Sequence, residues 1–324
     1  MSRKLITIST IMTLMSTSVI ADVPNVAADI APIHSLVSRV MDGVGAPKLI
    51  VQSGASPHGY RLRPSEAKAL QDADHVFWMG EELTPWLDSA IGTLASKASV
   101  TTLLDQQGVI LHDFREGALF EAHDHSAHGD DDHDDHDDHK DHDDHDDHDD
   151  HDDHGSHDPH AWLSPENAKL WLNIIASKLS VSDPENAATY FMNAAAGQAE
   201  IEAMIAEVKA TLKPVQGGKF VVFHDAYQYF ENDFDFYASG AISLGDSSDP
   251  SPARIEKVQK RIRDEGIQCV LAEPQFKKGL VATVMEGSDA TASVIDPLGA
   301  ELETGPKLYT RLIKNMAKTL RNCL

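Results

Sequence analysis

The chain has 324 residues, 41% of them hydrophobic, and a formal net charge of −25 at pH 7. The segment from Ala122 to Asp158 holds 18 Asp and one Lys, so it carries −17 and leaves −8 for the rest of the chain. This acidic balance argues against a nucleic-acid partner, because no basic stripe is present to meet phosphates. The length is sufficient for two domains with cores of their own.

The first residues have the pattern of a secretory leader. A charged start over 1–4 precedes an uncharged, largely apolar run from Leu5 to Ile20, and the small residues Val19 and Ala21 precede a cut before Asp22. The alternative is a membrane anchor, but the run is short and rich in Ser and Thr, whereas a spanning helix needs about 20 predominantly apolar residues. We therefore expect a signal peptide over 1–21 and an exported protein.

Strand and helix signals alternate in the first half of the mature chain. Pro32 and Pro64 occupy favoured first-turn positions of two helices. The alternation favours a parallel sheet with helices on both faces, in an N-terminal lobe over 22–181. The expected strands are 23–30, 48–52, 75–79 and 100–104, and the expected helices are one from Pro32, 64–70 and 83–94.

A low-complexity insert interrupts this lobe at about 122–158. It has no apolar residue beyond Ala127, and His-Asp-Asp repeats through most of it from His133 to His154. Such a composition cannot bury enough apolar surface to offset the entropy lost on ordering. We expect the insert to be disordered and its imidazoles to bind metal loosely at several places; the alternative is an acidic, solubilising tether.

Two strong helix starts follow the insert. Ser164-Pro165-Glu166 places a cap, a first-turn proline and an acidic residue in order, and the second start is Ser182-Asp183-Pro184-Glu185. The second helix is expected to reach Leu212, a length of about 28 residues or 42 Å. So long a helix between two α/β halves suits a rigid linker, which we place over 182–213.

A second α/β run predicts a C-terminal lobe over 214–324. Its expected strands are 220–223, 236–238, 268–272 and 293–295, and its expected helices are 251–265, 277–285 and 306–321. The predicted fold class is therefore α/β, with two lobes, each with a mostly parallel sheet flanked by helices, joined by one long helix. We expect a monomer.

The chain has two cysteines, Cys269 and Cys323. In an oxidising compartment such a pair is usually a disulfide, and closing a loop of this length would stabilise the fold by about 4 kcal/mol on the chain-entropy model. The alternative is a pair of unpaired thiols.

Three of the 18 histidines stand out by position. His224 ends an apolar strand, His58 follows another strand, and His160 lies between the insert and a helix start. Ligands in open α/β sheets bind beyond the carboxyl ends of strands, and neutral imidazole is a good ligand for Zn²⁺. The three side chains either converge on one metal ion or are unrelated loop histidines; spacing alone leaves both possibilities open.

Two carboxylates also end predicted strands. Asp296 is a candidate for the fourth ligand or for a group that orients a ligand histidine, and a loop or helix-capping role is an equal alternative. Glu273 is a supporting candidate only.

Five motifs, in order along the whole mature chain, resemble the metal-binding substrate-binding proteins of ABC importers, and more narrowly the periplasmic zinc-uptake component with a histidine-rich loop. They are His58 with Arg61-Leu62-Arg63-Pro64-Ser65, Trp162-Leu163-Ser164-Pro165, Phe223-His224-Asp225-Ala226-Tyr227, Ala272-Glu273-Pro274-Gln275-Phe276 and Asp296-Pro297-Leu298-Gly299.

The resemblance implies a periplasmic protein that is not an enzyme, binds Zn²⁺ between its lobes and docks transiently on an inner-membrane ABC permease. It places the first three ligand positions on His58, His160 and His224 and a strand-end carboxylate on Asp296. It also implies that the cysteine pair joins a strand to the C-terminal helix.

One position departs from the family pattern. Many zinc members carry a Glu immediately before the first ligand histidine, and here that position is Pro57. The fourth ligand is then water, Asp296 or a residue of the insert. His34 is a further candidate, with a hydrogen-bonded histidine on the helix surface as the alternative. Three imidazoles favour Zn²⁺ over Mn²⁺, which prefers oxygen ligands.

Other functions need different features. A manganese importer component would use more carboxylates. A secreted zinc hydrolase would need an open metal position and a general base, and the sequence contains no HExxH motif. A periplasmic zinc store or chaperone would share the ligands but would not dock on a permease.

Overall fold

The computed structural model describes residues 23–115, 120, 157–243, 250–276 and 278–324. The predicted signal peptide and residues 122–156 of the predicted insert lie outside this part of the chain. Within the described residues, no helix has the length and apolarity needed to cross a membrane.

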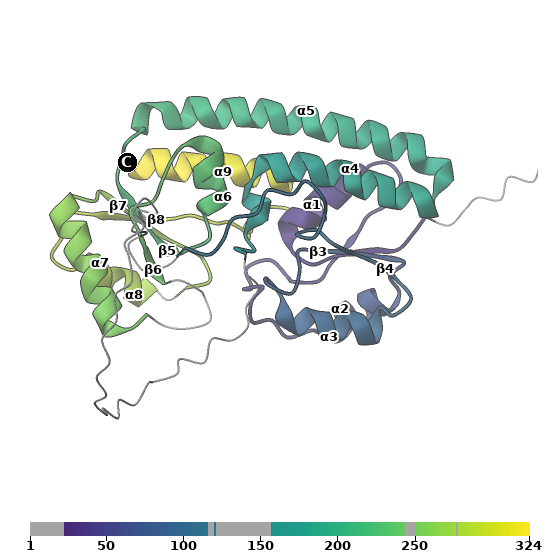
Figure 1. The fold of residues 1–324 in the computed structure, drawn as a ribbon, viewed down its shortest axis with the longest axis horizontal. Coiled ribbons are helices and arrows are strands. Elements are labelled where there is room, and N and C mark those ends of the chain that lie inside the picture. The colour runs from purple at the N-terminus through teal and green to yellow at the C-terminus, as the bar shows by residue number, and fades with distance from the viewer. Residues whose placement is uncertain (1–22, 116–119, 121–156, 244–249, 277) are drawn as a thin grey trace, which may run out of the picture.

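The first sheet has four parallel strands in the order β2-β1-β3-β4. Helices cover both of its faces, with α1 on one side and α2 and α3 on the other (Figure 1). Every residue of β3 is buried, as expected for a parallel sheet covered on both faces. The elements are β1 (Val26–Ala28), α1 (Ala31–Val40), β2 (Lys48–Leu49), α2 (Pro64–Gln71), β3 (His75–Trp78), α3 (Pro85–Leu94) and β4 (Ser99–Thr102).

The second sheet repeats this topology with the order β6-β5-β7-β8, again all parallel. The fold is therefore α/β with two parallel sheets, as the sequence predicts. The elements of this half are β5 (Phe220–His224), α6 (Gln228–Phe234), β6 (Ala241–Ser243), α7 (Pro252–Glu265), β7 (Cys269–Ala272), α8 (Lys278–Met285), β8 (Thr291–Val294) and α9 (Leu308–Cys323).

The prediction of a strand over 236–238 is wrong. The strand lies at Ala241–Ser243, and helix α6 was not predicted from the sequence. Phe236 and Ala238 are buried although they lie in a loop, and the ring of Phe236 stacks 5.4 Å from that of Phe220. Two buried residues at a spacing of two imitate the period of a strand.

A long helix joins the two halves. Helix α4 (Pro165–Ser182) is followed by a 3₁₀ turn at Pro184–Asn186, and α5 (Ala187–Leu212) then runs for 26 residues, about 39 Å. Figure 1 shows α5 above both halves, where it packs on α1, α4 and α9. Gly197 permits this approach, because a Cβ there would lie 3.0 Å from Leu172 and 3.1 Å from Arg39.

A disulfide joins Cys269 on β7 to Cys323 at the end of α9, with their Cα atoms 5.6 Å apart. The predicted pairing is confirmed, including its link between a strand and the C-terminal helix. Helix α9 is thereby tied to the sheet that carries His224.

Candidate metal centre

Three imidazoles from distant parts of the chain meet at one point. His58 lies in the loop after β2, His160 lies just before a 3₁₀ turn at Ala161–Leu163, and His224 is the last residue of β5. One ligand atom from each lies within 4.8 Å of the others. The ring centroids are 4.8 Å apart for His160 and His224, and 5.4 and 5.9 Å from His58 to these two.

The loop that carries His58 is held by the first lobe. The indole Nε1 of Trp86 donates a hydrogen bond to the carbonyl of Pro57, at 2.7 Å. The ring of Tyr60 lies 5.7 Å from that of Trp86, and its hydroxyl donates to Glu66 at 2.8 Å. Pro57 therefore contributes a backbone anchor at the position before the histidine.

His160 is oriented by a carboxylate two residues before it. Oδ1 of Asp158 accepts the backbone N–H of His160 at 3.0 Å and lies 2.6 Å from its Nδ1. Both side chains are buried. Burial raises the pKa of Asp158 to about 6, and the hydrogen bond from His160 opposes this shift. The short Nδ1 contact indicates that this nitrogen carries the proton, which makes Nε2 the atom available as a ligand donor.

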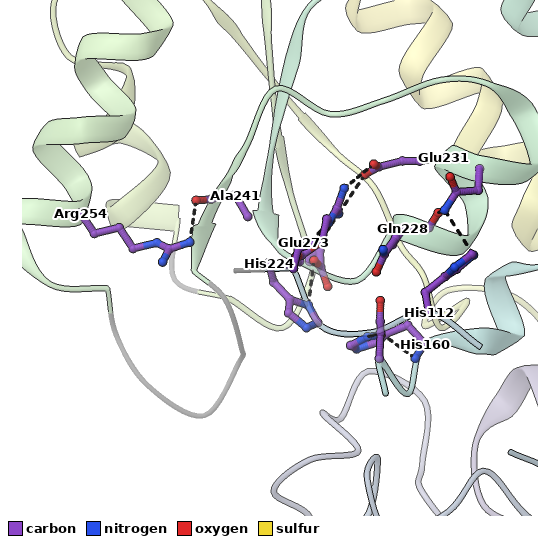
Figure 2. A network of polar contacts seen from close by, with 12 residues as sticks. His112, His160, His224, Gln228, Glu231, Ala241, Arg254 and Glu273 are labelled. Carbon is purple, nitrogen blue, oxygen red and sulfur yellow. Dashed lines mark hydrogen bonds and ion pairs between the residues drawn. The ribbon is translucent and has the colours of Figure 1, made fainter. Parts of the chain in front are cut away.

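His224 has a similar neighbour from the adjacent strand. Because β5 and β7 are parallel neighbours, their carboxyl ends meet at one edge of the sheet. Glu273 follows β7 there, and its Oε1 lies 3.4 Å from Nδ1 of His224 (Figure 2). The side-chain amide of Gln275 donates to the other oxygen of Glu273 at 2.8 Å. Two of the three imidazoles thus face a buried carboxylate at Nδ1.

A buried ion cluster adjoins His224. Arg115 pairs with Asp225, which follows His224 directly, and with Glu231 on α6. Burial raises the pKa of both carboxyl groups, and Arg115 opposes that shift in each case.

The other two sequence candidates lie outside the cluster of three imidazoles. Asp296 accepts the backbone N–H groups of Leu298, Gly299 and Ala300 at 3.0, 2.8 and 2.6 Å, so its carboxylate holds the loop after β8. His34 is buried on α1, with Nε2 3.2 Å from the carbonyl of Pro47 and Nδ1 3.4 Å from the hydroxyl of Ser38. Among the described residues, neither joins the group that could hold a metal ion.

Sequence reasoning missed Asp158 and Arg115. Asp158 was included in the predicted disordered insert, whereas the structure places it, 2% exposed, in the folded part of the chain. Its signal was the order Asp158-Pro159-His160 at the end of the repeat, where the apolar residues resume. Arg115 had no local signal, because its partners lie more than 100 residues away.

Comparison with known proteins identifies the family of the chain. The family model described as zinc-uptake complex component A, periplasmic, matches residues 26–323. The chain is 49% identical over 304 residues to the high-affinity zinc uptake system protein ZnuA of Brucella abortus, covering 92% of this chain and 91% of that protein. It is 44% identical over 305 residues to the protein of that name from Paracoccus denitrificans, covering 94% and 93%.

Solved structures share the fold. A crystal structure of ZnuA superposes with a TM-score of 0.72 at 21% identity, covering 93% of this chain and 99% of that one. A ZnuA deletion mutant with zinc bound gives 0.72 at 22% identity, covering 93% and 98%. The match over nearly the whole chain, with relatives above 40% identity, shows that the chain belongs to the family of periplasmic zinc-uptake component A proteins.

Proposed function

We propose that the protein captures Zn²⁺ outside the inner membrane with His58, His160 and His224 and delivers it to an ABC-type import permease. The convergence of three imidazoles from three separate segments is the observation that supports this most. Imidazole nitrogens suit Zn²⁺, which is bound tetrahedrally with Zn–N distances of about 2.0–2.1 Å. The relatives named as zinc uptake proteins support the choice of zinc and of import.

A water molecule is our proposal for the fourth position of the site. Asp296 is the alternative carboxylate, but three backbone N–H groups already hold it in its loop. Ligation would require it to give up some of these bonds, each worth roughly 1.5–3 kcal/mol to a charged acceptor. We propose instead that Asp296 supports the loop after β8.

The histidine-rich insert is proposed as an accessory binder. Its His/Asp-rich composition predicts several weak sites, so micromolar affinity is expected there. The site formed by the three imidazoles should bind Zn²⁺ in the nanomolar range or tighter, on the order of −12 kcal/mol. A permanent zinc store would bind zinc in the same way but would not deliver it to a permease.

Competition titrations with a zinc chelator test the tight site. His58→Ala, His160→Ala and His224→Ala should each weaken tight binding by more than the roughly 10- to 100-fold that removal of an outer-shell partner costs. His34→Ala is the matched control, because it removes a buried imidazole outside the cluster, and it should leave the tight site intact. Equal effects of all four substitutions would contradict the assignment.

The same titration across pH 5.5 to 8 gives an independent test. A ligand imidazole must be neutral, so zinc affinity should fall as pH drops below the reference pKa of about 6.5. Affinity that stays flat across this range would contradict a site with three imidazoles. Delivery is tested by zinc uptake in cells that lack the gene, with and without the wild-type protein.

A further inference from the structure

The ion cluster of Arg115, Asp225 and Glu231 lies next to two of the three histidines. Nε of Arg115 lies 3.0 and 3.1 Å from the two oxygens of Asp225, and Nη2 also contacts Asp225. Nη1 donates to Glu231 at 2.6 Å. The three side chains are no more than 16% exposed, and Figure 2 shows Glu231 in the same network as His224 and His160.

Arg115 itself belongs to the segment beside His160. Residues 112–115 and 157–160, which we call the stem, pair with each other: Asp113 and His157 form an antiparallel bridge, and the N–H of Asp158 donates to the carbonyl of His112 at 2.8 Å. The guanidinium therefore reaches from the stem to the turn between β5 and α6, where Asp225 follows His224.

A second contact joins the stem to the same helix. The hydroxyl of Tyr229 on α6 donates to the carbonyl of Asp158 at 2.7 Å and accepts the N–H of His112 at 3.1 Å. The amide of Asn232 lies 3.2 Å from Nε2 of His112. These bonds position the stem on α6. The turn that directly follows His224 is linked to the stem by the ion pair between Arg115 and Asp225.

We propose that Arg115 is a positioning residue for the metal site, whose planar fork fixes the turn after His224 relative to the stem that carries His160. This rests on the proposed function of these histidines. Attraction to the metal cannot be the role of this guanidinium, because its positive charge repels a bound cation. Arg115 instead fixes the relative positions of the two segments, because its rigid guanidinium donates hydrogen bonds to two carboxylates at once. The single ammonium of lysine lacks this planar arrangement of donors.

The test is Arg115→Lys, which keeps the charge and removes the fork. Its matched control is Arg39→Lys, because Arg39 is similarly buried, at 14% exposed, and binds Glu200 with Nε and Nη2 at 3.2 and 3.1 Å away from the site. R115K should weaken tight zinc binding by about tenfold or more, as for loss of an outer-shell partner, and should alter the visible spectrum of bound Co²⁺. R39K should change neither.

A second variant covers the case in which R115K does not fold. Arg115→Gln with Glu231→Gln removes one charge of each sign and leaves a side-chain amide to meet Asp225, so it should again weaken zinc binding. Wild-type affinity and Co²⁺ spectrum in the variant that folds would overturn the proposal, as would equal losses in R39K. Weak zinc binding by the wild-type protein would instead refute the proposed function.

Discussion

At the scale of single residues, the carboxylate of Asp158 should matter most after the ligands themselves. Its contact of 2.6 Å with Nδ1 of His160 fixes the orientation of the ring and raises the basicity of the other nitrogen. Asp158→Asn keeps the shape and an acceptor oxygen but removes the charge. We expect zinc affinity to fall by about 10-fold, measured by chelator competition at pH 7.5.

The stem offers a matched control for this substitution. Asp113 faces Nδ1 of His157 at 2.9 Å, but its side chain is 83% exposed and His157 lies outside the metal cluster. Asp113→Asn should therefore leave the tight site unchanged. A loss as large as that in D158N would mean that general charge near the stem, and not the orientation of His160, sets the affinity.

The sequence could single out His58, His160 and His224 because each has a structural context of its own: a strand end, a position just past a strand, or a helix start. The local signal for Asp158 was weaker, since it was only the order Asp158-Pro159-His160 at the end of the repeat. It is the last of many aspartates in the same His/Asp-rich segment, and composition does not distinguish it from the others. Its buried position depends on α6, which contributes Tyr229 from 71 residues away. Partners this distant leave no local pattern, and for the same reason Arg115 could not be found.

At the scale of elements, the disulfide between β7 and α9 should be a major source of stability. It closes a loop with a sequence separation of 54, and the chain-entropy model gives about 4 kcal/mol for that length. Cys269→Ser with Cys323→Ser should lower the free energy of unfolding by about that amount in urea titrations. A reductant should lower the free energy of unfolding of the wild-type protein by a similar amount and leave that of the double variant unchanged. A smaller difference in this free energy between wild type and double variant would mean that α9 is held mainly by its apolar face.

Proline and capping residues made several elements predictable. Helices α2, α4 and α7 all begin at a proline, and the hydroxyls of Ser164 and Ser251 cap the last two. Prediction failed where burial came from a loop, as at Phe236. The break between α4 and α5 was predicted, but α5 begins later than expected, at Ala187, because the buried Asp183 binds Asn186 and Tyr190 and favours a separate turn.

At the scale of the whole molecule, the βα rhythm predicted two lobes and the long helix between them. It could not predict how the chain crosses from one half to the other. Residues 158–164 precede α4 of the first half, yet side-chain hydrogen bonds join them to the second half, among them those of Tyr229 to Asp158, Ser164 to Asp233 and Trp162 to Pro297. His160 and His224 therefore lie on one connected body, while α2 and α3 hold the loop that carries His58.

This connectivity predicts that the insert is separable from the tight site. The stem pairs residues on both sides of the insert, and α6 holds it through Tyr229. Replacing residues 123–156 by a Gly/Ser linker of equal length removes the acidic and imidazole groups without changing the length of the chain. The number of zinc ions bound per protein should fall, while one tight site remains.

Thermal unfolding also tests whether the tight site is independent of the insert. Free zinc at about 1,000 times the Kd of the tight site should stabilise both the wild-type and the linker protein by about 4 kcal/mol, since only the folded state holds the site. The stem contacts explain why the variant should keep this response. If the linker protein lost its zinc-dependent stabilisation, the insert would have to supply a ligand to the site of three imidazoles, and the fourth position would belong to one of its side chains rather than to water.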